Sequence, residues 1–223
     1  MCCYTRRHWI TLRMIRSILL LGTLVGLSMG EIYYTVNCTG SEDIYQYNAT
    51  LLDGSATINF GDYRGKVFVI YNVASFCGMT NATYHQINYL ASKFAEDDFL
   101  IIGFPCDNFG QLEPASSYDE IVNGVKYVRP GGGFVANLTY FEKIDVNGDN
   151  EHPIYTYLKQ ANCPYTDTEF RTGLFYSPER VSDVRWNWEK FLIAKDGKPY
   201  KRYHYSTMDP AYLEDDIAYL LSQ

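Results

Sequence analysis

The chain has 223 residues, 47% of them hydrophobic, and a formal net charge of −7. Nucleic acids and anionic membranes attract basic surfaces, so this acidic balance argues against both as partners. The length suits one domain with a sizeable core.

The first thirty residues have the features of a secretory signal peptide. Four arginines precede an apolar run over 18–27, which is too short to cross a bilayer. Ser28 and Gly30 are the small residues expected before a cleavage at Glu31. We therefore predict a signal peptide over 1–30 and a secreted, extracellular protein without a membrane anchor, an uncleaved signal anchor being the alternative. Removal of residues 1–30, which contain four arginines and no acidic residue, would change the formal charge from −7 to −11.

Sequons and cysteines fit the secretory route. The predicted glycosylation sites are Asn37, Asn48, Asn81 and Asn137. Asn81 lies close to Cys77 in sequence, so we expect it to be unused or directed away from that residue. The cysteines that remain after processing are Cys38, Cys77, Cys106 and Cys163. An oxidising compartment would allow a disulfide among them, but the spacing does not give the pairing.

In chain order, the patterns predict an extended arm over 31–43 and one domain over 44–223. A hairpin over 44–60 turns at Asp53-Gly54, and a buried strand follows over 67–71. Beyond Gly78 the period becomes helical, with Ile87, Leu90, Ala91 and Phe94 on one face.

The second half continues the same alternation. The predicted elements are a buried strand over 99–104, a short helix over 116–125, a helix from Pro153, a hairpin over 188–205, and a last helix with Asp209 as N-cap and Pro210 as its first residue. This order indicates an α/β fold, with a central mixed β-sheet flanked by helices on both faces.

Cys77 lies where the first buried strand leads into a helix. Unpaired N–H groups and the helix dipole favour an anion at such a position, and a thiolate is an anion. Thr80 holds the place of a second cysteine at CxxC spacing, which argues against a dithiol oxidoreductase. The alternative interpretation is a small buried structural cysteine.

Metal and nucleotide sites have little support. The four histidines show no ligand spacing. The Asp145–Asp149 stretch suggests a calcium loop, but its glycine is misplaced and Thr156 stands where the last carboxylate ligand belongs. We therefore predict no metal and no nucleotide cofactor.

Five sequence blocks together resemble the glutathione peroxidase family. They are NVASFCG at 72–78, GFPCDNFG at 103–110, KYVRPGGGF at 126–134, KIDVNG at 143–148 and DVRWNWEKFL at 183–192. The similarity extends from about Ile44 to Leu221 and is strongest to the secreted, plasma and epididymal branch, with cysteine where many members carry selenocysteine. It implies a thioredoxin-like fold and a homotetramer formed through the 126–150 loop.

The resemblance also implies a chemistry. Cys77 would reduce hydrogen peroxide and organic or lipid hydroperoxides through a sulfenic acid, with glutathione or another small thiol as co-substrate and no cofactor. Trp186, Asn187 and Asn108 would donate hydrogen bonds to its sulfur, although a core aromatic is the alternative for Trp186. Asn108 replaces the family's glutamine and is one methylene shorter. Asp107 is interpreted as a solvated loop acid.

The substrate-binding arginines implied by the resemblance are Arg64, Arg185 and Arg202. Residues 111–130 contain no cysteine, so the two-cysteine route of thioredoxin-dependent members is closed. Cys106 falls at the family's structural cysteine and is expected to be buried and inert. Two other functions stay open: a protein thiol oxidase or redox sensor, and a catalytically weak secreted binding glycoprotein of the same fold.

Overall fold

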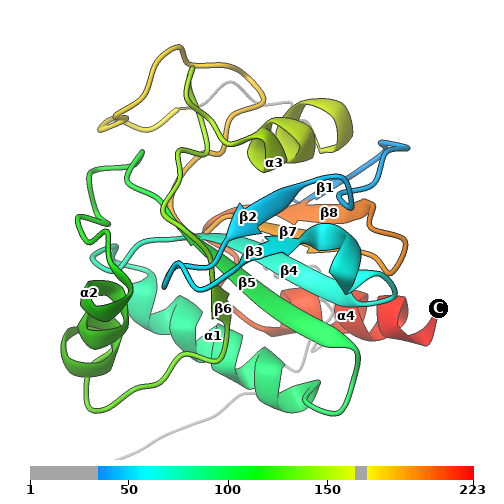
Figure 1. Ribbon diagram of the computed structural model, residues 1–223, viewed down its shortest axis with the longest axis horizontal. Helices are drawn as coiled ribbons and strands as arrows, with labels where there is room; N and C mark the ends of the chain where they lie inside the picture. The colour runs from blue at the N-terminus through cyan, green and yellow to red at the C-terminus, as the bar shows by residue number, and fades with distance from the viewer. Residues whose placement is uncertain (1–34, 164–169) are drawn as a thin grey trace, which may run out of the picture. The chain divides into compact units, whose positions relative to one another are not determined.

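A six-stranded mixed sheet lies at the centre of the structure (Figure 1), a computed structural model that describes residues 35–163 and 170–223. The strand order is β1-β8-β7-β4-β5-β6. The predicted signal peptide and the start of the predicted arm lie outside the described residues.

Two adjacent strands of the sheet, β4 and β5, are the buried runs that the sequence predicted. Strands β4 (Val67–Val73) and β5 (Phe99–Pro105) pair in parallel, and every residue of β4 is buried. Strand β6 (Thr139–Tyr140) extends the sheet in parallel on the far side of β5. A continuous apolar run in β4 is stable because both faces of the sheet are covered.

The other side of β4 is antiparallel. Strand β7 (Lys190–Ile193) pairs with β4, and β8 (Pro199–Tyr203) follows it in the predicted hairpin. Strand β1 (Thr35–Asn37) pairs with β8, so part of the predicted arm belongs to the sheet.

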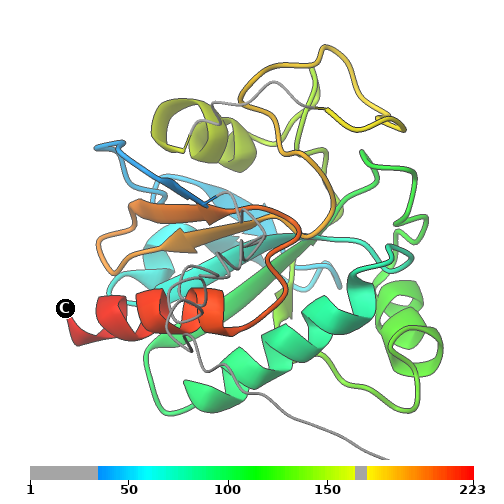
Figure 2. The same ribbon diagram turned by 180° about the vertical axis from the view of Figure 1, so that it is seen from behind.

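Helices cover both faces of this sheet. Helices α1 (Thr80–Lys93) and α4 (Ala211–Ser222) lie on one face, and α3 (Pro153–Thr156) lies on the other (Figures 1 and 2). The predicted architecture is confirmed. Helix α4 begins one residue later than predicted, because Asp209 accepts a hydrogen bond from the Ala211 N–H while Pro210 is the N-cap. No helix within the described ranges is long and apolar enough to span a bilayer.

Shorter elements complete the fold. The predicted hairpin near the start consists of β2 (Asn48–Thr50) and β3 (Thr57–Asn59), and the predicted short helix is α2 (Tyr118–Asn123). Ser117 and Glu120 form a capping box at the start of α2. One π-helical turn follows α2 over 124–128 and another follows α3 over 157–162.

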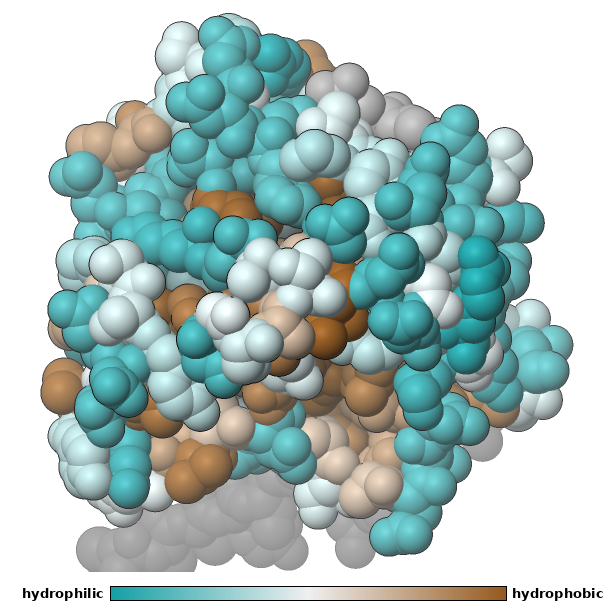
Figure 3. Space-filling view, viewed as in Figure 1, coloured by the Kyte–Doolittle hydropathy of each residue, from teal (hydrophilic) through white to brown (hydrophobic). Residues whose placement is uncertain are grey.

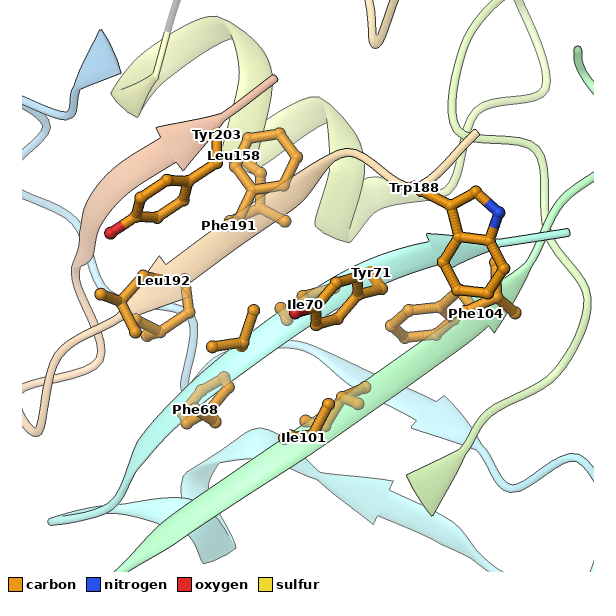
Figure 4. Close-up of a cluster of buried hydrophobic side chains, with 14 of the residues drawn as sticks. Phe68, Ile70, Tyr71, Ile101, Phe104, Leu158, Trp188, Phe191, Leu192 and Tyr203 are labelled. Carbon is orange, nitrogen blue, oxygen red and sulfur yellow. The ribbon is translucent and has the colours of Figure 1, made fainter. Parts of the chain in front are cut away.

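The core is aromatic and continuous across the central strands. Figure 4 shows Phe68 and Tyr71 of β4, Phe104 of β5 and Phe191 of β7 within one buried cluster. Trp188 lies at the end of this cluster and makes an edge contact with Tyr84 of α1 at 5.0 Å between ring centroids. By contrast, hydrophilic side chains dominate the face drawn in Figure 3, with apolar groups scattered among them.

One disulfide joins Cys38 to Cys163, with 4.4 Å between their Cα atoms. It connects the residue after β1 to the end of the helical segment that begins with α3. This settles the pairing that the sequence left open. Cys77 and Cys106 are free thiols.

Removing this disulfide should destabilise the fold. Its cysteines are 125 residues apart in sequence, and a cross-link over so long a loop restricts the unfolded chain. We expect Cys38→Ser to lower the free energy of unfolding by about 2–5 kcal/mol, measured by urea denaturation. Adding a reductant should lower the wild-type midpoint to that of the variant. Equal midpoints for oxidised wild type and variant would contradict the prediction.

Candidate active site

Cys77 lies in the turn between β4 and α1, at the carboxyl end of β4. The Thr80 N–H donates to the Cys77 carbonyl at 3.1 Å, and α1 begins at Thr80. The predicted strand-to-helix position of the thiol is therefore confirmed. Cys77 is only 3% exposed, so the sulfur is recessed rather than displayed on the surface.

A buried carboxylate holds the chain just before this thiol. Oε2 of Glu113 accepts hydrogen bonds from both the backbone N–H and the hydroxyl of Ser75, each at 2.7 Å. Burial raises the pKa of Glu113 above its ordinary value, with the two Ser75 contacts opposing the shift. Asp107 accepts from the Glu113 N–H at 3.0 Å and lies 3.7 Å from Lys143. Asp107 thus stabilises the loop over 107–113.

Trp186 and Asn187 form a tight turn ahead of β7. Trp186 is 8% exposed, and its ring packs on Phe109 with 5.7 Å between centroids. Asn187 is buried and donates from Nδ2 to the Phe109 carbonyl at 3.1 Å. Its Oδ1 has no hydrogen-bond partner in the described part of the chain. The Asn72 side chain in β4 donates to the Trp186 carbonyl at 3.0 Å, which ties this turn to the strand that leads to Cys77.

The Asn108 side chain makes hydrogen bonds other than the one expected to the Cys77 sulfur. Its Nδ2 donates to Asp145 at 2.8 Å, and its Oδ1 accepts from the N–H groups of Val146 and Asn147 and from the Cys106 thiol. The side chain therefore caps the 145–147 loop. The expectation that Asn108 donates to the Cys77 sulfur does not match these contacts, because the shorter amide is already engaged at both ends.

The expected substrate arginine Arg64 lies at the wrong end of the sheet. It precedes β4, whereas Cys77 follows it, and the seven residues of β4 separate the two by roughly 20 Å along the strand. The exposed Arg64 guanidinium stacks 4.0 Å from the centroid of the Tyr45 ring. This position excludes direct contact with a substrate at Cys77.

The other two expected arginines are buried in the protein. Arg202 is fully buried, pairs with Glu189, and donates to the carbonyls of Cys163 and Asp183 at 2.9 Å each. Arg185 is 3% exposed and donates to the Val181 carbonyl at 2.8 Å. Both guanidinium groups satisfy backbone carbonyls of an irregular segment, so their role is structural rather than substrate binding.

Two exposed arginines that the sequence did not single out flank the site. Arg129 donates from Nη1 to the carbonyls of Cys77, at 3.0 Å, and Phe76, at 3.3 Å. Arg171 stacks over Trp186 with its Cζ 4.4 Å from the ring centroid. Arg129 belongs to the glycine-rich block, which offered a signal, whereas Arg171 lies in a segment without any motif. Arg129 thus brings positive charge to the backbone of Cys77, and Arg171 brings it to the indole of Trp186.

The remaining predicted residues fall as follows. Cys106 is fully buried, and burial raises the pKa of its thiol to about 12, so it stays protonated. The four sequon asparagines, Asn37, Asn48, Asn81 and Asn137, are all exposed. Within the described ranges no group of three or more histidine, cysteine or acidic side chains could hold a metal ion.

Comparison with known proteins identifies close relatives. A family model described as glutathione peroxidase matches residues 44–159. Glutathione peroxidase 6 of Mus musculus is 45% identical over 179 residues, which cover 79% of this chain and 80% of that protein. Glutathione peroxidase 3 of Hylobates lar is 43% identical over 92% of this chain and 91% of its own length. The epididymal secretory glutathione peroxidase of Sus scrofa is 43% identical over 79% of this chain and 80% of its own length.

Solved structures give the same relationship. The T. cruzi GPX1 structure has a TM-score of 0.59 and 26% identity, covering 81% of this chain and 97% of that one. The structure of Trgpx in apo form has a TM-score of 0.57 and 27% identity, covering 82% and 97%. A thioredoxin-like superfamily protein, SPOA0173, has a TM-score of 0.52 at 14% identity over 81% and 97%, which shows the fold alone. The expected thioredoxin-like fold is confirmed.

Proposed function

Because the chain belongs to the glutathione peroxidase family and is an oxidoreductase of the peroxidase class, we propose that Cys77 is its peroxide-reducing nucleophile. The observation that carries this proposal is the placement of a free thiol between β4 and α1, with the Trp186–Asn187 turn bonded to the same end of β4. The substrates are hydrogen peroxide and organic or lipid hydroperoxides.

The reaction runs through a sulfenic acid. The Cys77 thiolate attacks one peroxide oxygen, an S–O bond forms, the O–O bond breaks, and the departing oxygen takes up a proton to leave as water or an alcohol. A first small thiol then attacks the oxidised sulfur, releases water and forms a mixed disulfide. A second thiol attacks that disulfide and regenerates the Cys77 thiol. The two thiols leave together as their disulfide, so the electrons balance.

The proposed donors are Trp186 and Asn187. An indole N–H only donates, so it stabilises a thiolate or the charge that develops on the peroxide. Asn187 is buried and gives one amide hydrogen to the Phe109 carbonyl, so its second Nδ2 hydrogen is the one proposed for the sulfur. Asn108 is not included, since both ends of its amide serve the 145–147 loop.

We infer that the reducing substrate is a small anionic thiol such as glutathione. Arg129 beside the Cys77 carbonyl and Arg171 over the Trp186 ring are exposed cations on either side of the reacting region. Guanidinium groups bind carboxylates well, and each carboxylate of such a thiol would find a partner there. These two residues replace Arg64, Arg185 and Arg202 as the proposed substrate arginines.

We further propose assembly as a homotetramer, but through a smaller surface than the 126–150 loop as a whole. Residues 139–150 are largely held by the core through β6 and Val146, whereas Tyr127 and Val128 are each 64% exposed and Val135 is 71% exposed. Large exposed apolar side chains of this kind mark association surfaces. Native mass spectrometry of the protein gives the mass of the assembled particle and therefore the number of subunits. A monomer at micromolar protein concentration would refute the tetramer.

Secretion is proposed on the amino-terminal pattern, on the disulfide and on the names of relatives such as the epididymal secretory glutathione peroxidase. Exposure of all four sequon asparagines is compatible with glycans at each. Mass spectrometry of protein collected from the medium, before and after glycosidase treatment, reports both secretion and sequon use; retention of the whole product in cells would refute secretion.

The nucleophile can be identified by comparing the two free cysteines. We expect Cys77→Ser to abolish peroxide consumption, because no other described thiol lies at the site. Peroxide should make wild-type protein react with dimedone, a sulfenic acid probe, at Cys77 alone, as read by peptide mass spectrometry. Cys106→Ala is the control: its thiol is buried and protonated, so activity should persist. Residual wild-type activity in Cys77→Ser would end the proposal.

The arginine assignment predicts a selective loss. Arg171→Gln and Arg129→Gln should each raise the KM for glutathione by roughly 10-fold, the cost of one charge-assisted contact. They should change the KM for an uncharged thiol such as β-mercaptoethanol by less than twofold. Arg64→Gln, whose side chain stacks on Tyr45 at the other end of β4, serves as the exposed control. A raised KM in the control, or none in the other two, would contradict the assignment.

A further inference from the structure

Asn72 is a polar residue inside an otherwise largely apolar, fully buried strand. It is fully buried, and its side chain makes two hydrogen bonds to one turn. Nδ2 donates to the Trp186 carbonyl, and Oδ1 accepts from the Glu189 N–H, both at 3.0 Å. The Asn72 carbonyl also accepts from the Trp188 N–H at 2.8 Å.

These bonds replace the sheet ladder where it stops. Strands β4 and β7 pair as far as Tyr71 and Lys190, and the chain ahead of Lys190 departs from the strand direction. Trp188 has a φ of +76°, a left-handed conformation that a bulky side chain rarely adopts. The turn therefore needs support from outside, and Asn72 binds it on both sides of Trp188.

We propose that Asn72 is a positioning residue for peroxide reduction, which acts by fixing the Trp186–Asn187 turn against the strand that leads to Cys77. The inference rests on the proposed roles of Cys77 and Trp186. Asn72 lies five residues ahead of Cys77 in the same chain segment. The Asn72 side chain thus links the strand that leads to Cys77 with the turn that contains Trp186 and Asn187.

An amide suits this position better than other side chains of its size. It donates through one end and accepts through the other, and the turn presents one carbonyl and one N–H. An aspartate has nearly the same shape and keeps the acceptor for Glu189. It would, however, set an acceptor oxygen against the Trp186 carbonyl, which is itself an acceptor, so this side of the turn would be repelled.

The test measures the two half-reactions separately by stopped flow, on the full chain. We expect Asn72→Asp to slow oxidation of the reduced enzyme by hydrogen peroxide by roughly 100-fold, the cost of a small misplacement of a reacting group. Reduction of the oxidised enzyme by β-mercaptoethanol, an uncharged thiol that does not depend on Arg171 over the Trp186 ring, should change by less than twofold. Because Asn72 acts through the turn that carries Trp186, adding Asn72→Asp to Trp186→Phe should slow oxidation by clearly less than the product of the two single effects.

Gln86→Glu is the matched control. Gln86 is an equally buried amide, 2% exposed, which donates to the Thr207 carbonyl at 3.3 Å and accepts from Tyr71 at 3.4 Å. It has no hydrogen bond to the 186–189 turn, so the same amide-to-acid change should affect stability without selectively slowing oxidation. Should Asn72→Asp fail to fold, as judged by circular dichroism, Asn72→Ser takes its place, since it removes the long-reaching amide without adding charge.

The outcomes separate the two proposals. If Trp186→Phe slows oxidation by hydrogen peroxide but the Asn72 variant is oxidised at the wild-type rate, this inference alone is overturned. Equal slowing of both half-reactions, equal effects of the Asn72 and Gln86 changes, or additive effects in the double variant would overturn it in the same way. A wild-type oxidation rate in Trp186→Phe would overturn the proposed donor and this inference with it.

Discussion

The complete burial of β4 is the constraint on which the site depends. All seven of its residues are buried, β5 pairs with it on one side, and β7 pairs with it on the other. A strand held at both edges and both faces has little freedom to shift, because protein interiors are close-packed. The turn that contains Cys77 therefore starts from a fixed point, and α1 begins at Thr80 directly after it.

Buried charged side chains hold the irregular segment over 180–189 in place, as the sheet holds the strand that leads to Cys77. The chain over 180–189 has no helix or strand of its own, so its carbonyls need other partners. Arg202 and Arg185 supply donors to the carbonyls of Asp183 and Val181, while Lys159 pairs with the Asp183 carboxylate at 3.3 Å. Such pairs are costly to bury, but breaking one leaves an unpaired charge inside the protein, which costs more. The network thus fixes the path of the segment that delivers Trp186.

Periodicity was sufficient to predict the buried strands β4 and β5, helix α1 and the place of Cys77 between strand and helix, because these follow from which residues must be buried, but it did not predict the short strands β1 and β6. Neither periodicity nor the family pattern could predict in which direction a side chain points or which groups it contacts. Arg202 was assigned to substrate from its place in a family pattern, yet it lies on β8 with its guanidinium inside the protein. Asn108 kept an amide at the expected position, but one missing methylene and the nearby 145–147 loop gave that amide other partners. Arg171 and the Cys38–Cys163 pairing depend on tertiary contacts that no local pattern records.

The residues of the candidate site differ in how far they lie from solvent. Cys77 and Trp186 are 3% and 8% exposed, whereas Arg129 and Arg171 stand in solvent around them. A recessed thiol meets the small hydroperoxide end of a substrate before anything bulkier, and low exposure strengthens each hydrogen bond made there. In the proposed reaction the exposed cations would act on a different partner, since a negatively charged thiol is attracted to positive side chains at the rim even on a protein with a net charge of −7. If Cys77 is the nucleophile that we propose, the depth of its sulfur would bear on which peroxide reacts and the exposed arginines on which thiol completes the cycle. Changes at one level would then leave the other largely undisturbed.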